Sequence, residues 1–226
     1  MAMVIQWRIV AAASAAALLM LASQYMIWVW SPVEAQMGII QKIFYTHVAL
    51  AWWGFVFFFL VFVFSVLYLV KRRERYHLLA GAAGEIGVLF SGLVLLTGMA
   101  WAKASWNTWW TSDPRLSTAL VMWFVYSAYL LVRDLDPAEA RMKTVAAVLG
   151  IVAFLDVPLV FFSARMWRSA HPSVVASRGG GLPESMALTL IVSLLAWGAL
   201  CGLMFWLRSG QLEARNRIAE LLWGDW

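Results

Sequence analysis

The chain has 226 residues and a formal charge of +5, with 63% of its residues hydrophobic and only 13% charged. An ordinary soluble domain has roughly 25% charged residues, so water is not the main solvent of this chain. The basic residues gather at the ends of apolar blocks and form no stripe, which indicates membrane topology and argues against nucleic-acid binding. The single cysteine, Cys201, excludes an intrachain disulfide and a C-x-x-C pair, and no C-x-x-C-H haem-attachment sequence occurs.

Six apolar blocks predict an all-α polytopic membrane protein with one domain over residues 1–226. Each block is near or above the roughly 20 residues that a transmembrane helix needs. We expect spans at about 8–30, 43–70, 78–101, 116–133, 144–164 and 186–207. The first block also has features of a signal peptide, but its apolar run continues through Trp30, and we interpret it as a helix.

The distribution of Lys and Arg predicts that both termini are cytoplasmic. The N-terminus, the 71–77 and 133–143 loops and the tail after 207 hold eleven of the seventeen basic residues. The outward segments are then a short one at 31–42, a loop at about 102–115 and a longer loop at about 165–185. No G-x-x-x-x-G-K-[ST] sequence occurs, so the chain has no nucleotide site of this kind.

Two of the three histidines are expected on the outer side. His47 lies near the outer end of the second span and His171 in the loop after the fifth, and neutral imidazole is a good axial ligand for haem iron. Alone, a loop histidine such as His171 is more often solvated. Ala51 and Gly54 share a face with His47 and leave a groove for a flat macrocycle or, more commonly, for close helix packing. His77 follows a basic run, which predicts a solvated side chain.

The outer loop after the third span is rich in tryptophan, with Trp101, Trp106, Trp109 and Trp110 within ten residues. Indoles favour the membrane interface, so an aromatic belt is one interpretation. A belt needs only one or two indoles per helix end and does not require the charged residues in this loop. Stacked indoles beside a cation would suit a porphyrin face and its propionates. The available cations are Lys103, Arg115, Arg165 and Arg168.

Two acidic residues, Glu85 and Asp156, lie inside expected spans. A charge there is costly, so we expect each to find a partner within the bundle or to be protonated. A proton relay would require further acids in register across the membrane, and the sequence lacks them.

Three separate segments resemble the CcmC family, the haem-handling membrane component of cytochrome c maturation, over nearly the whole chain. Tyr45-x-His47-Val48 is similar to its second-helix histidine motif. The run from Trp106 to Leu116 is similar to its tryptophan-rich WWD motif, and the segment from Pro158 to His171 to its fifth-helix and loop motif. The WWD pattern is close to W-G-T-W-W-x-W-D-x-R-L, and here Asn107 replaces the glycine and Ser112 a tryptophan.

The resemblance implies that His47 and His171 are the axial ligands of a transiently and non-covalently bound haem b. It also implies a haem-binding set formed by these two histidines with Trp106, Trp109, Trp110, Asp113, Arg115 and Trp167. The chain would hold haem on the periplasmic face of the inner membrane and present it to the chaperone CcmE, in a complex with CcmA, CcmB and CcmD. No residue of this chain would act as a nucleophile, so it would be a platform and not an enzyme.

Other classes of protein remain open from the residues alone. A cytochrome b-like electron-transfer subunit predicts histidines paired within spans, whereas one outer histidine here lies in a loop. A haem-handling protein of the CcsA or CcmF kind shares the tryptophan motif but usually has more spans. A transporter that moves haem across the bilayer is the third alternative.

Overall fold

The computed structural model describes residues 2–135, 139–167 and 182–223, and every regular element in these ranges is helical. The helices are α1 (Ala2–Tyr25), α2 (Ile43–Lys71), α3 (Glu74–Trp106), α4 (Pro114–Leu135), α5 (Ala140–Ala153), α6 (Asp156–Met166) and α7 (Glu184–Trp223). A π-helical turn over Met26–Trp30 extends α1, and a 3₁₀ turn over Ile39–Lys42 precedes α2. Six helical stretches are long and apolar enough to cross a membrane, with α5 and α6 forming one of them, so the six-helix prediction is confirmed.

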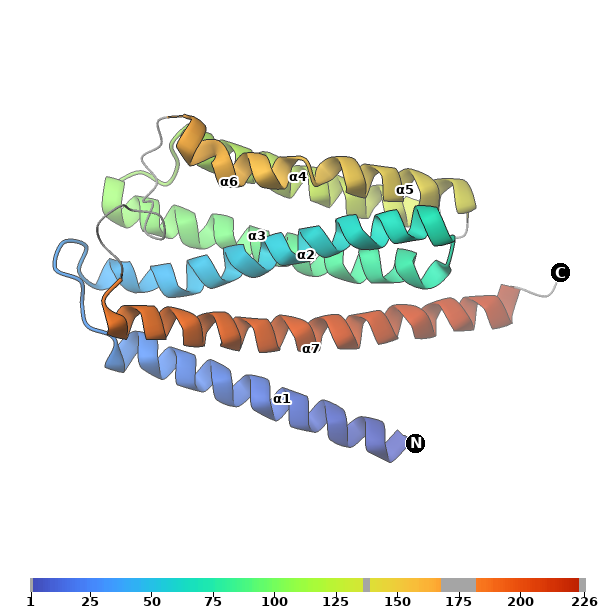
Figure 1. The fold of residues 1–226 in the computed structure, drawn as a ribbon, viewed down its shortest axis with the longest axis horizontal. Helices are drawn as coiled ribbons and strands as arrows, with labels where there is room; N and C mark the ends of the chain where they lie inside the picture. Colours follow the sequence, from blue (N-terminus) through green and yellow to red (C-terminus); the bar gives the residue numbers. More distant parts are fainter. Residues whose placement is uncertain (1, 136–138, 168–181, 224–226) are drawn as a thin grey trace.

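The helices run side by side, and the two ends of the bundle differ in what they carry (Figure 1). Helices α2 and α3 form a central hairpin, with α4, α5 and α6 on one side and with α1 packed beside α7 on the other. We call one end the tryptophan end, formed by residues 31–42, 107–113 and Trp167. The opposite end, the terminal end, carries both chain termini and the tight turn at residues 72–73.

The core between α2, α3 and α4 is built from large aromatic side chains that fit around glycines. The rings of Phe58 and Tyr126 stack with their centroids 3.6 Å apart, and both side chains are fully buried. A Cβ atom on Gly87 would lie 2.5 Å from the Phe58 ring, so only glycine lets α3 approach this pair. Such close approach is a common way to pack helices in lipid, where burial of apolar surface gives little driving force.

The fifth span is interrupted between α5 and α6. Proline lacks an N–H, and its ring clashes with the carbonyl four residues earlier, here that of Phe154, so Pro158 breaks the regular helix. The chain tightens at this point: the N–H groups of Phe154 and Leu155 donate to carbonyls three residues back, at 3.3 and 3.1 Å. Asp156 begins α6, where a carboxylate suits the positive end of the helix dipole.

Glu85 has a partner within the bundle, as expected. The Arg208 guanidinium on α7 donates two hydrogen bonds to the Glu85 carboxylate on α3, Nη2 to Oε1 at 2.9 Å and Nε to Oε2. The bidentate pair therefore ties α7 to the central hairpin. For Asp156, the described part of the chain offers no hydrogen-bond partner to the buried Oδ2 atom.

The prediction of a solvated His77 is wrong, because the side chain is only 5% exposed. Helix α2 continues to Lys71 and α3 begins at Glu74, so His77 lies in the first turn of α3 and packs against Tyr68, with ring centroids 5.6 Å apart. The backbone oxygen of His77 accepts a hydrogen bond from Nη1 of the buried Arg133, at 2.8 Å. A Cβ on Gly81 would lie 2.2 Å from that guanidinium carbon, so α3 makes room for the arginine here.

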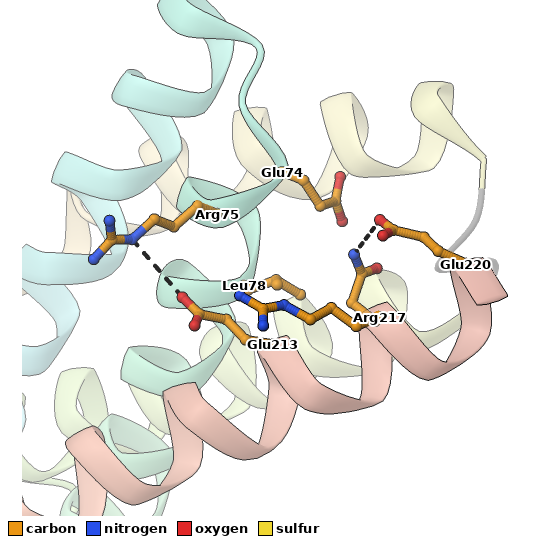
Figure 2. A pocket seen from close by; sticks show the side chains of 7 residues that line it. Glu74, Arg75, Leu78, Glu213, Arg217 and Glu220 are labelled. Carbon is orange, nitrogen blue, oxygen red and sulfur yellow. Dashed lines mark hydrogen bonds and ion pairs between the residues drawn. The ribbon is translucent and has the colours of Figure 1, made fainter. Parts of the chain in front are cut away.

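A pocket of about 420 Å³ lies at the terminal end, between the first turns of α3 and the last turns of α7 (Figure 2). Its lining consists of Glu74, Arg75, Leu78, Glu213, Asn216, Arg217 and Glu220. Arg75 Nε lies 3.8 Å from Glu213 Oε1, and Asn216 donates to Glu220 at 2.7 Å (Figure 2). Arg75 with Glu213 and Asn216 with Glu220 thus form pairs within the lining, which includes no aromatic ring or histidine, so the pocket does not resemble a haem site.

Candidate functional site

His47 lies in the second turn of α2, half-buried against the outer part of α3. Its Nδ1 atom is 2.9 Å from the Thr97 hydroxyl oxygen. A Cβ on Gly98 would lie 3.2 Å from His47 Cε1, closer than most such contacts, so the absence of a side chain at Gly98 lets the ring lie against α3. The imidazole is therefore held by two consecutive residues of the neighbouring helix.

Gly54, two turns further along α2, serves helix packing. It is buried, and a Cβ there would lie 3.8 Å from the Ser91 nitrogen and 3.9 Å from the Phe90 Cβ. The interpretation of this position as a close helix contact is therefore favoured over an open groove for a macrocycle. The less buried position near His47 is Ala51, which is half-buried.

The tryptophan loop begins where α3 ends, and Asn107 sets its start. Its backbone has φ 57° and ψ 21°, the left-handed conformation that commonly ends a helix. Glycine adopts this conformation most easily and asparagine is the usual second choice, which explains how asparagine can replace the glycine of the family pattern. Lys103 Nζ donates to the Asn107 carbonyl at 3.2 Å and to its side-chain oxygen at 2.9 Å, so this cation stabilises the helix end.

The indoles of this segment have different surroundings. Trp106 packs edge-to-face on Trp101, with ring centroids 5.0 Å apart, and is half-buried. Trp110 is half-buried too, and its carbonyl accepts a hydrogen bond from the Thr108 hydroxyl at 2.9 Å. Trp109 is 57% exposed. Trp109 therefore has most of its surface exposed, whereas Trp101, Trp106 and Trp110 are half-buried.

Asp113 and Arg115 begin α4. The Asp113 carboxylate accepts the Arg115 backbone N–H at 2.9 Å, and its carbonyl accepts the Ser117 N–H at 2.9 Å. Asp113 is thus the N-cap, and Pro114 follows at the first helical position, where a missing N–H costs nothing. Asp113 is 8% exposed, so its carboxylate is part of the fold of the loop as well as a predicted site residue.

Trp167 ends α6 at the same end of the bundle and is 47% exposed (Figure 1). Its N–H donates to the Ser163 carbonyl at 3.0 Å, which closes the last turn. His171 and Arg168 lie outside the described residues, as does the side chain of Arg165.

The structure thus brings His47, the tryptophan loop and Trp167 to one end of the bundle, from helices α2, α3, α4 and α6 (Figure 1). Thr97 and Trp106 are nine residues apart on α3, so the loop begins about 13 Å further out along the helix axis than the His47 contact. His47 is consequently set back from the loop.

Sequence reasoning missed several residues at this end. Thr97 and Gly98 are fifty and fifty-one residues from His47, and no periodic pattern links them. Lys42 is buried and donates to the carbonyls of Trp28 at 3.1 Å and Ser31 at 3.3 Å, which closes the π-helical end of the first span. A lysine beside an apolar block was a signal, but from the sequence alone it indicated only membrane topology.

The residues present fit a haem group. An imidazole whose Nδ1 faces a hydroxyl is oriented as axial histidines commonly are, and exposed indole faces suit a flat apolar macrocycle. Thr111, in the tryptophan loop, has a buried hydroxyl without a hydrogen-bond partner in the described ranges, so the loop retains an unused polar group. These features favour a ligand with an apolar face and a polar edge.

Fold and site together define a multi-pass membrane protein with an oriented imidazole and exposed indoles at one end. The chain belongs to the CcmC family, described as heme exporter protein C, whose pattern it matches over residues 1–223. Membership implies haem handling in cytochrome c biogenesis.

Relatives in bacteria and plants have similar sequences. Identity is 31% over 172 residues with heme exporter protein C of Bradyrhizobium diazoefficiens, covering 75% of this chain and 65% of the relative. It is 29% over 187 residues with a cytochrome c biosynthesis ccmC-like mitochondrial protein of Marchantia polymorpha, covering 82% and 79%. With heme exporter protein C of Escherichia coli it is 28% over 148 residues, covering 64% and 60%, so the matches leave between a fifth and two fifths of each relative uncovered.

Proposed function

We propose that this protein holds haem at its tryptophan end, on the periplasmic face of the bacterial inner membrane, and delivers it to the chaperone CcmE. It would do so with CcmA, CcmB and CcmD, and both of its termini would be cytoplasmic. Haem b is the cargo, bound non-covalently and transiently, with His47 and His171 as the axial ligands of its iron. Family membership supports this assignment of class, and the arrangement around His47 supports the choice of site.

The observation that carries the proposal is the placement of a half-buried, oriented imidazole at the same end as two exposed indoles, Trp109 and Trp167. Indoles at an interface offer apolar faces, and an aromatic face against a porphyrin excludes water from the iron. The terminal end has a histidine as well, but His77 is packed inside the bundle. The two ends therefore differ in the accessibility of an imidazole.

The other residues of the proposed site have separable tasks. The Arg115 guanidinium, at the start of α4, supplies positive charge for a propionate, since hydrogen bonds between ionised groups are the stronger ones. Asp113 and Asn107 keep the loop between α3 and α4 in its conformation. Transfer to a chaperone then requires this protein to orient its cargo, and apart from ligation of the iron no covalent bond links haem to its side chains.

The test is the optical spectrum of haem bound to the purified protein. Wild type should give a low-spin, bis-histidine spectrum that is lost in His47→Ala and in His171→Ala. Added imidazole should restore it in His47→Ala by occupying the vacated position. The matched control is His77→Gln, which keeps the backbone bond to Arg133 and should leave the spectrum unchanged. A wild-type spectrum in both ligand variants would contradict the proposal.

A further inference from the structure

Thr97 has a hydrogen-bonding arrangement that constrains the tautomer of His47. Its Oγ1 atom lies 2.8 Å from the Leu93 carbonyl oxygen, 3.1 Å from that of Val94 and 2.9 Å from His47 Nδ1. The hydroxyl has one proton to donate. Two oxygens 2.8 Å apart repel each other unless a hydrogen lies between them, so that proton goes to the helix carbonyl.

The imidazole must then be the donor in the remaining contact. A neutral histidine carries a proton on one ring nitrogen and a lone pair on the other. If Nδ1–H donates to Thr97, the lone pair lies on Nε2. Thr97 itself is fixed by its bond to the Leu93 carbonyl on α3, and the absence of a side chain at Gly98 lets the ring lie against that helix.

We infer that Thr97 is a positioning residue that holds His47 as the Nδ1–H tautomer and so presents Nε2 as the ligand atom. The inference rests on the proposed function for the role of Nε2 as a ligand, but the tautomer itself is a property of the protein without haem. Metal-ligating histidines usually donate their second ring N–H to a nearby acceptor, which fixes the ring and makes the ligand more basic. A more basic ligand stabilises ferric over ferrous iron, so Thr97 also lowers the reduction potential of bound haem.

The experiment uses the full-length protein, labelled with ¹⁵N at histidine, in nanodiscs and without haem. Ring-nitrogen chemical shifts distinguish the two tautomers, and a His47→Gln sample assigns the His47 signals. Wild type and Thr97→Ser, which keeps the hydroxyl, should show the Nδ1–H tautomer. Thr97→Val, which has the same shape without an acceptor, should shift the population towards Nε2–H. Thr189→Val is the matched control, because Thr189 makes the same 2.8 Å bond to the carbonyl four residues earlier, on α7.

Haem-loaded samples give a second readout. Thr97→Val should release haem about tenfold faster than wild type, at the low end of the effect of such supporting residues because threonine is a neutral acceptor. The midpoint potential of haem bound to Thr97→Val should be higher than in wild type. Thr97→Ser should have the wild-type release rate and the wild-type midpoint potential. An Nε2–H tautomer in wild type, or an unchanged tautomer in Thr97→Val, would overturn the inference. A His47→Ala protein that keeps the bis-histidine spectrum would instead contradict the proposed function, because His47 would then not be a ligand. That outcome would leave the tautomer result unchanged.

Discussion

The two ends of the bundle each contain a histidine in the outer turns of a helix, but the surroundings of the two rings are opposite. At the terminal end, His77 is enclosed by Tyr68 and lies beside the buried Arg133. At the tryptophan end, His47 is half-buried and its Nδ1 faces a hydroxyl. The same residue type is therefore buried at one end and half-buried, within the proposed site, at the other. What separates them is the neighbouring helix, which the local sequence of each histidine does not reveal.

The largest effect on stability is expected where the terminal end is most tightly packed. Replacing Arg133 by Met removes the donor to the buried His77 carbonyl and should lower the free energy of unfolding by about 2–3 kcal/mol. Haem binding to the folded protein should not change. Thermal unfolding in detergent, followed by tryptophan fluorescence, measures the loss. Arg215→Met, at an exposed position of α7, is the control, with an expected change within about 0.5 kcal/mol.

A smaller loss of stability is expected when the ion pair that ties α7 to α3 is broken. Glu85→Gln keeps the shape of the side chain but cannot accept two hydrogen bonds from Arg208, and should cost about 1–2 kcal/mol because the pair is partly exposed. The exchange Glu85→Arg with Arg208→Glu should recover part of this loss in the same unfolding assay. If the single variant is as stable as wild type, the pair does not stabilise the bundle.

The start of the tryptophan loop should respond to backbone conformation. Asn107→Ala places an ordinary residue at φ 57° and should cost about 1 kcal/mol, whereas Asn107→Gly avoids this strain and should lose only the exposed hydrogen bond from Lys103, a smaller cost. Because the loop is part of the proposed site, Asn107→Ala should also release haem faster, and stopped-flow transfer to apomyoglobin measures the rate. Equal rates of haem release from Asn107→Ala and Asn107→Gly would show that the conformation of the loop does not control haem retention.

The smallest effect is expected beside His47. Gly98→Ala brings a methyl group to 3.2 Å from His47 Cε1, so the ring must move by a few tenths of an ångström. We expect haem affinity to fall a few-fold, about 1 kcal/mol or less, with little change in unfolding. Titration of the apoprotein with haem measures this. Gly202→Ala on α7, where no atom lies within 4 Å of the added methyl group, should bind as wild type does.

Much of the fold could be predicted from hydropathy, because a lipid-spanning helix must be a long apolar run. The interruption at Pro158 was visible as a proline inside a span, but its effect on Phe154 and Leu155 appeared only with the hydrogen bonds. The burial of His77 could not be predicted, because the basic run suggested a loop through this position. In the structure the turn is only two residues long, so α3 begins at Glu74 and His77 lies within the helix.

The candidate site was less predictable than the fold. Motif resemblance selected His47 and the tryptophan loop, and the replacement of a glycine by Asn107 indicated a left-handed backbone once the helix end was known. The contact between His47 and Thr97 joins residues fifty positions apart. Such a pairing depends on how α2 and α3 are aligned, which no local pattern contains.

The central claim is that haem binds at the tryptophan end, and electron paramagnetic resonance of spin labels tests it most directly. In a Cys201→Ala background, a nitroxide is attached at Ser112→Cys or at Arg215→Cys, both exposed positions. Arg215 lies 31 residues along α7 from Glu184, about 45 Å by helix geometry. Ferric haem should accelerate relaxation of the label at residue 112 and leave that at residue 215 unchanged. Acceleration at residue 215 alone would place haem at the terminal end and contradict the account.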